Sequence, residues 1–210
     1  MRLKHLNIAI LCLLGLLGLA FLSLLYYARR TQRDAERFVR DVSTLRIGQS
    51  SLSDVTPIGQ KYASYVVPNP HTPQVCNPEH CELDFAFHNW PAFLTLRKSD
   101  MTAAVLFQTG SLRGIYVGAA CAATNRKPPF VPTFVVIVNQ ALYNPPGLHG
   151  GAVSSGNGYS FNLGPDATPE QLAKVYGFNF DILDRFGGCH DATEMFSENP
   201  GHWPQALWTK

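Results

Sequence analysis

The stretch that decides the architecture is LNIAILCLLGLLGLAFLSLLYYA, residues 6–28, which contains 23 residues and no charged side chain. A helix rises about 1.5 Å per residue, so this stretch is long enough to cross a bilayer core of about 30 Å. It ends in Tyr26 and Tyr27, and such aromatic residues are typical of the membrane interface. We therefore predict that residues 1–28 form a transmembrane anchor, with the membrane as a partner of residues 6–28.

A cleaved signal peptide is the alternative interpretation of the same residues. Signal peptides have a short apolar core followed by small residues before the cleavage site. Here the core is long, and it ends in Tyr26, Tyr27, Ala28 and Arg29. A lipid-modified Cys12 is also disfavoured, because a leucine precedes it where a small residue is expected. The sequence therefore favours an uncleaved signal-anchor of a single-pass membrane protein.

Two features disagree about which side of the membrane the rest of the chain faces. Five arginines follow the span within 12 residues, which by the positive-inside rule favours the cytoplasm. Four cysteines in the globular part, an even number, suit an oxidising compartment. These are Cys76, Cys81, Cys121 and Cys189. Because large domains can translocate against a modest charge bias, we favour a cell-membrane protein with an extracytoplasmic domain.

The remaining chain divides into three parts by its hydrophobic periodicity. Residues 29–47 repeat apolar side chains at three- and four-residue steps, which predicts a helical stalk. Residues 48–197 form an α+β domain, in which segments around residues 83–87, 105–117, 134–138 and 159–163 predict an antiparallel sheet. Residues 198–210 form a C-terminal tail that we expect to dock through Trp203 and Trp208.

Short helices are expected on both sides of the sheet segments in the sequence. Ser51 and Asp54 form a capping-box pattern that opens a helix to about residue 63. Thr168, Pro169 and Gln171 combine an N-cap, a first-turn proline and a reciprocal glutamine, so a helix begins there and ends near residue 177. A second helix is expected at residues 179–186, and Asp191 caps a last turn.

Charge and composition exclude one class of partner. The chain is 46% apolar and 15% charged, as expected for a globular protein rather than a disordered one. Residues 48–210 carry nine Lys and Arg side chains against twelve Asp and Glu. A nucleic-acid binder needs a basic face to neutralise phosphates. We therefore expect no nucleic-acid partner.

The four cysteines of the domain have three interpretations. Disulfides are favoured by the compartment argument, with Cys76 joined to Cys81 across a short turn and Cys121 to Cys189 across a long loop. Reduced, buried thiols are the second. The third is a zinc site in which Cys76, Cys81 and His80 are joined by Cys189 or His190. The usual pair of zinc knuckles is lacking in the sequence, so we assign no metal and no other cofactor.

The sequence Gly187-Gly188-Cys189-His190 resembles the Gly-Cys motif of the L,D-transpeptidases, and His149-Gly150 resembles their upstream His-Gly pair. The resemblance implies a nucleophilic Cys189 with a histidine base, and this defines a cysteine-dependent envelope enzyme as the alternative function. The family places Ser or Thr and His or Asn before the glycine, whereas Phe186 and Gly187 stand here. We therefore assign no catalytic residue and favour a non-enzymatic domain.

A second resemblance concerns the start of the domain. Residues 45–51 (LRIGQSS), followed by Asp54 and Lys61, resemble the opening motif of outer-membrane assembly lipoproteins of the SmpA/OmlA type. The whole layout is similar to uncharacterised bacterial single-pass membrane-anchored proteins. The resemblance supports the architecture and carries no activity. We therefore expect a membrane-anchored, envelope-facing interaction or scaffold domain with an unknown protein partner.

Overall fold

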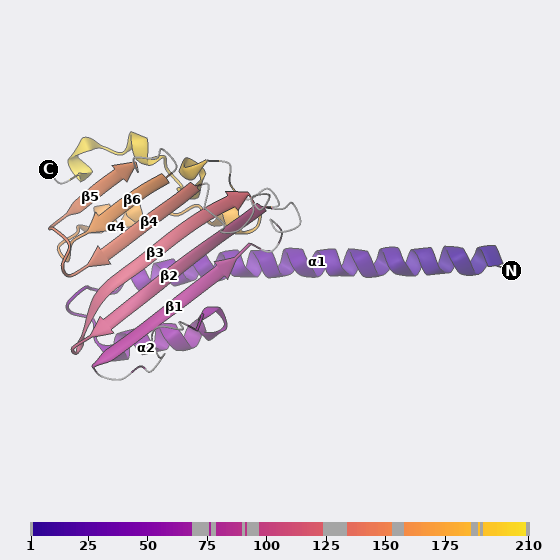
Figure 1. Cartoon of the computed structure of the whole chain (residues 1–210), viewed down its shortest axis with the longest axis horizontal. Coiled ribbons are helices and arrows are strands. Elements are labelled where there is room, and N and C mark those ends of the chain that lie inside the picture. Colours follow the sequence, from indigo (N-terminus) through magenta and orange to yellow (C-terminus); the bar gives the residue numbers. More distant parts are fainter. Residues whose placement is uncertain are drawn as a thin grey trace.

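The computed structural model describes residues 2–68, 76, 79–89, 91, 97–123, 134–152, 158–185, 189 and 191–208. Its main features are a long helix, α1 (Arg2–Ser43), and a six-stranded sheet against which the C-terminal end of that helix packs (Figure 1). The N-terminal part of α1 extends far beyond the sheet. The α+β fold class expected from the sequence is confirmed.

Helix α1 joins the predicted anchor to the predicted stalk without a break. Within the described residues it is the one helix long and apolar enough to cross a membrane. Its second half does not stand clear of the domain as a stalk would. Its buried side chains, which include Ala35, Phe38 and Val42, belong to the same core as the sheet. In space the domain therefore begins near Ala28, which is fully buried, and not at residue 48.

The sheet is mixed, and it has the order β1-β2-β3-β4-β6-β5. Its strands are β1 (His80–His88), β2 (Arg97–Gln108), β3 (Ser111–Ala123), β4 (Phe134–Ala141), β5 (Leu148–Ala152) and β6 (Gly158–Leu163). All neighbouring pairs are antiparallel except β4 and β6, which are parallel. The expectation of an antiparallel sheet is therefore correct for four of the five pairs.

The turn between β2 and β3 follows from two residues. Thr109 and Gly110 both have positive φ, 51° and 80°, and Gln108 pairs with Ser111 on either side of them. A two-residue hairpin turn with positive φ at both positions matches the right-handed twist of the strands. Gly110 adopts this conformation without a steric penalty.

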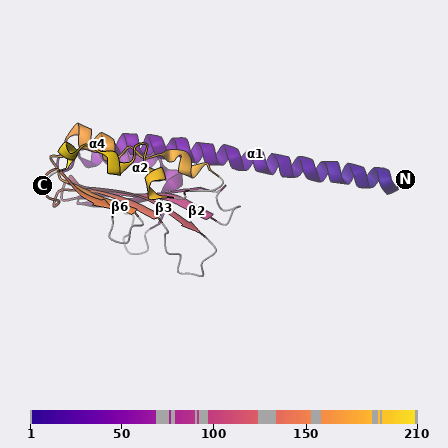
Figure 2. The same cartoon turned by 90° about the horizontal axis from the view of Figure 1, so that it is seen from above.

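The helices and 3₁₀ helices of the domain lie on one face of the sheet (Figure 2). Besides α1 they are α2 (Leu52–Lys61), η1 (Ala63–Tyr65), α4 (Pro169–Val175), η2 (Phe180–Leu183), η3 (Ala192–Met195), η4 (Pro200–His202) and η5 (Gln205–Leu207). Both predicted capping boxes are present, at Ser51 with Asp54 and at Thr168 with Gln171. The helix predicted at residues 179–186 is instead the short η2, which Asn179 caps by accepting from the Asp181 N–H.

The core lies between this helical layer and the sheet. Phe38 of α1 is fully buried, and its ring centroid is 4.6 Å from that of Phe85 and 5.4 Å from that of Phe87. At the other end, Trp203 is buried against Phe161 with centroids 5.1 Å apart, and Trp208 stacks on Trp203. The tail therefore docks through its tryptophans, as predicted.

Candidate functional site

The cysteines pair as the sequence predicted. Cys121 lies near the end of β3, and its Cα is 5.9 Å from that of Cys189; the Cα atoms of Cys76 and Cys81 are 4.1 Å apart. Both separations are below the limit of about 7 Å for a disulfide. The long pair attaches the segment after η2 to the sheet, and the Ser99 hydroxyl lies 3.2 Å from the Cys121 sulfur.

The zinc site considered above is not assembled by the described residues. Among them, no group of three His, Cys, Asp or Glu side chains could hold a metal ion. Cys76 and Cys81 pair with each other, while Cys189 lies with Cys121. His190 lies outside the described residues. The cysteines therefore form two separate pairs.

The two parts of the transpeptidase-like pattern are not brought together either. His149 of β5 pairs with Asn162 of β6. Asn162 pairs with Asn139 of β4, which in turn pairs with Tyr116 of β3, so His149 and Tyr116 lie at the same level of the sheet. Cys121, the partner of Cys189, stands five residues further along β3, so it points to the opposite face of the sheet. His149 and Cys121 are therefore separated by three strand spacings across the sheet and five residues along it, which is about 20 Å. His149 Nε2 lies 2.8 Å from the carbonyl oxygen of Pro146.

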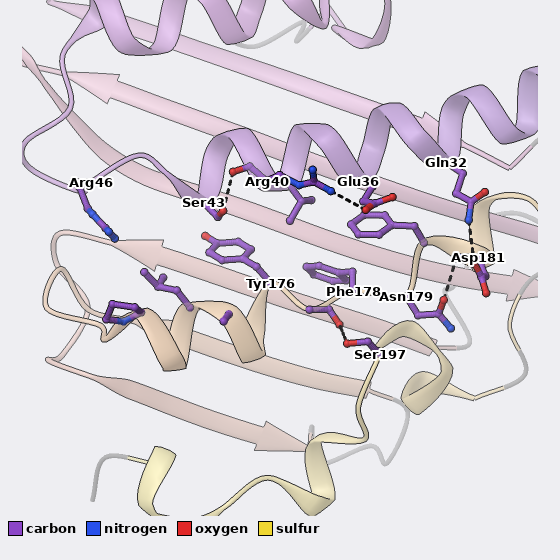
Figure 3. A pocket seen from close by; sticks show the side chains of 16 residues that line it. Gln32, Glu36, Arg40, Ser43, Arg46, Tyr176, Phe178, Asn179, Asp181 and Ser197 are labelled. Carbon is purple, nitrogen blue, oxygen red and sulfur yellow. Dashed lines mark hydrogen bonds and ion pairs between the residues drawn. The ribbon is translucent and has the colours of Figure 1, made fainter.

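A groove runs between the second half of α1 and the segment from α4 to η2 (Figure 3). Its volume is about 550 Å³, within the usual range for binding pockets. The lining residues are Gln32, Glu36, Val39, Arg40, Ser43, Arg46, Pro169, Leu172, Ala173, Tyr176, Gly177, Phe178, Asn179, Phe180, Asp181 and Ser197. We name it the α1–α4 groove, and it is the candidate functional site.

The floor of the α1–α4 groove is apolar. Val39, Leu172, Tyr176 and Phe178 are each at most 6% exposed, so they form part of the core as well as the groove. The Tyr176 hydroxyl is turned inward and donates to Gln140 Oε1 at 3.1 Å. Burial raises the pKa of Tyr176 above its ordinary value. The phenol therefore stays protonated and has a structural role below the groove.

The rim of the α1–α4 groove is polar and charged. On the α1 side, Arg40 donates to Glu36 at 2.9 Å. At the end near the apolar stretch of α1, Gln32 Nε2 donates to Asp181 Oδ1 at 2.9 Å and bridges the two walls. Arg46 lies at the other end. An apolar floor with paired donors and acceptors around it suits the binding of a polypeptide segment.

Two acidic residues, Asp181 and Asp184, lie at the η2 end of the groove wall and just beyond it. Asp181 is exposed, but it is part of the bridge to Gln32 and lies 3.8 Å from Arg185. Asp184 is half-buried. Burial, followed by the neighbouring Asp181 carboxylate, raises the pKa of Asp184. Asp181 therefore connects η2 to α1 through Gln32.

The α1–α4 groove was not found from the sequence, because its walls are far apart in the chain. Gln32 and Asp181 are separated by 149 residues. One local signal was present: Gln32, Glu36, Arg40 and Ser43 follow one another at three- and four-residue steps beside the apolar stripe. This spacing predicts a polar helix face, but it does not indicate which segment lies opposite.

A smaller hollow lies on the sheet face opposite the helices. It has a volume of about 360 Å³, and its sheet residues include Ala86, Thr102, Ala104 and Tyr116. Tyr116 is 37% exposed, and burial raises the pKa of its phenol. The hollow offers few polar groups, so it provides less basis for specificity than the α1–α4 groove.

Comparison of the chain with protein-family models, with curated proteins and with solved structures finds no match.

Proposed function

We propose that this chain is a membrane-anchored interaction or scaffold protein whose domain faces the cell envelope outside the cytoplasm. The observation that carries the proposal is the continuity of α1. One helix contains the apolar stretch and then contributes Phe38 and Val42 to the core of the domain. The domain is thus attached to its anchor by a packed helix, and its groove is held at a fixed position relative to the membrane.

Membrane insertion is supported by the exposure of the first half of α1. Leu11, Leu16 and Leu19 are 64–68% exposed, and the N-terminal part of α1 extends far beyond the sheet. Contiguous apolar surface of this size is rare on soluble monomers and is characteristic of an interaction site or a membrane segment. Its length matches a bilayer core. Alkaline extraction should leave the full chain in the membrane pellet, and release into the soluble fraction would contradict insertion.

The extracytoplasmic orientation is supported by the two cysteine pairs, because disulfides persist in oxidising compartments. A protease added to intact spheroplasts should digest the domain from outside. Full protection, with digestion only after lysis, would reverse the orientation. In parallel, alkylation without reduction should label neither Cys121 nor Cys189.

The α1–α4 groove is the proposed contact surface for the protein partner. From Gln32 to Ser43 it follows 11 steps of the helix, or about 16 Å, which matches about five residues of an extended chain. The apolar floor supplies burial, and the rim supplies hydrogen-bond partners that fix orientation. No cysteine or histidine is among the described residues that line it. Binding is therefore the function that this lining supports best.

Site-specific photo-crosslinking in intact cells tests the partner proposal. A photoreactive amino acid is placed at Glu36 or Ala173, on opposite walls of the groove, and as a control at Thr102 on the other sheet face. Both groove positions should give one shared adduct that Thr102 does not give. Different adducts from the two walls, or the same adduct from Thr102, would contradict a partner in the groove.

A further inference from the structure

A hollow of about 530 Å³ follows α1 where the apolar stretch ends. Its end toward the anchor is lined by Leu22, Leu25 and Tyr26, and its end toward the domain by arginines that include Arg30 and Arg33. The hollow thus changes from apolar to cationic along the helix, at the level where a bilayer changes from hydrocarbon to headgroups. This change of character is the basis of the inference.

The arginines of this segment are exposed and only partly neutralised. Asp34 is the one carboxylate in the lining; it lies 3.7 Å from Arg30 Nε and 3.9 Å from Arg37 Nη1. Asp34 also accepts a hydrogen bond from the Tyr65 hydroxyl. Arg33 has no ion-pair partner among the described residues, so the lining keeps a positive charge.

The helix geometry places three of these guanidinium groups at headgroup level. Arg29, Arg30 and Arg33 follow Ala28 by one to five residues, which corresponds to about 2–8 Å along the axis. The polar layer on each side of a bilayer is about 5–8 Å thick. Helical side chains also tilt toward the N-terminus, so these arginines point back toward the span.

We infer that Arg29, Arg30 and Arg33 bind the phosphate headgroup of an anionic phospholipid whose acyl chain lies along Leu22 and Leu25. This inference rests on the membrane anchoring proposed above. Guanidinium groups bind phosphate with paired hydrogen bonds, which gives geometric specificity beyond charge. An acidic protein segment could meet the arginines but could not follow the leucines into the hydrocarbon layer. The anionic lipid therefore fits both ends of the hollow.

The test uses the full chain reconstituted in mixed phosphatidylcholine and phosphatidylglycerol vesicles. Spin-labelled forms of each lipid report which one is immobilised at the protein surface. Wild type should prefer phosphatidylglycerol by about fivefold or more, because each basic residue near an anionic surface contributes about that factor. Replacing Arg29, Arg30 and Arg33 together by glutamine should reduce the ratio to about one.

A matched control removes the same charge elsewhere. Arg40→Gln, Arg46→Gln and Arg113→Gln together should leave the preference unchanged, because Arg40 is already about 18 Å beyond Ala28. An equal loss in this control would overturn the inference in favour of net charge. So would an absence of preference in wild type.

Two further measurements separate the remaining outcomes. Inorganic phosphate at the concentration of the lipid phosphate should not remove the preference, and displacement by it would assign the arginines to free phosphate and overturn the inference. Flotation of the vesicles checks insertion independently, so failure of the anchor is distinguishable from failure of lipid selectivity. Arg33→Gln alone, which breaks no ion pair among the described residues, should still lower the ratio if the triple variant does not fold.

Discussion

The two halves of α1 are one continuous helix with opposite surroundings. In the first half, Leu16 is 66% exposed. In the second half, Phe38 is fully buried between the sheet and Tyr62. The first half is apolar on nearly every side, whereas the second is apolar on one face and charged on the other.

This difference shows that apolar side chains of one helix can be exposed on all sides in one half and packed into a protein core in the other. A helix that is hydrophobic all round needs lipid or a core on every side, while an amphipathic helix needs one covering surface. The apolar face of the second half is covered by the sheet, so this half contributes to folding free energy. The apolar window of the first half is not buried by the domain, as the proposed membrane anchor requires. Substitutions in the two halves should therefore have separable effects.

The largest predicted effect is on the buried half. Phe38→Ala removes a ring that contacts Phe85, Phe87 and Tyr62, and we expect it to reduce the free energy of unfolding by about 5 kcal/mol. Urea unfolding of the full chain in nonionic detergent measures this through the fluorescence of Trp203 and Trp208. Leu16→Ala is the matched control and should not move the transition. Equal shifts would contradict the separation of the two halves.

The second prediction concerns the covalent tie on the domain side. If Cys121 and Cys189 are oxidised, replacing both by alanine releases a loop of 68 residues and should cost about 4 kcal/mol. Cys76→Ala with Cys81→Ala releases a far shorter loop and should cost about 2 kcal/mol. Comparison of both variants with wild type, with and without reductant, checks this. A long-loop variant as stable as wild type would indicate that the pair is reduced.

Local sequence signals predicted those parts of the molecule that short segments determine. The helix over the apolar residues 6–28 and the N-cap at Thr168 each need only their own neighbours, and each is present. The pairing of Cys121 with Cys189 was predicted because a disulfide between Cys76 and Cys81 closes the shortest loop. That assignment leaves Cys121 and Cys189 as the second pair. The local features are stabilised by contacts within a few residues. The long cysteine pair was instead predicted by elimination, once the short pair was assigned.

Long-range contacts account for what the sequence could not supply. Strand β5 was not predicted, because Gly150 and Gly151 have low strand propensity and its position depends on pairing with β6. The parallel pairing of β4 with β6 depends on the connection between them. The periodicity of residues 29–47 predicted an apolar stripe, but the stripe is the same for a stalk and for a core helix. The α1–α4 groove exists only if residues 29–47 pack against the domain as a core helix. Because these residues were predicted to be a stalk, the groove was not predicted.

The third prediction concerns a hydrogen bond that attaches the buried half of α1 to η1. The Tyr65 hydroxyl donates to Asp34 Oδ2 at 2.8 Å. Burial, and then this bond to a carboxylate, raise the pKa of Tyr65 to about 12, against about 10 in an unfolded chain. Because the folded-state pKa is the higher one, the stabilisation is complete below pH 10 and is lost as the pH rises toward 12.

Tyr65→Phe should therefore lower the unfolding free energy by about 1 kcal/mol at pH 7. Its stability should then fall less than that of wild type between about pH 10 and 12. Thermal unfolding across this range measures the difference, with Tyr143→Phe, at an exposed position, as the control. Parallel pH profiles for wild type and Tyr65→Phe would contradict the proposed role of this bond.

The smallest predicted effect is at the rim of the α1–α4 groove, on the polar face of α1 beside its buried stripe. Arg40 pairs with Glu36 one turn earlier, and both side chains are at least half exposed. Exposed pairs of this spacing contribute about 0.3–0.5 kcal/mol and are screened by salt. Arg40→Gln should therefore shift urea unfolding by no more than this, and less in high salt. A loss above about 1 kcal/mol would show that the pair supports the fold. A small loss leaves both charges available to a partner, because the folded state does not depend on their mutual contact.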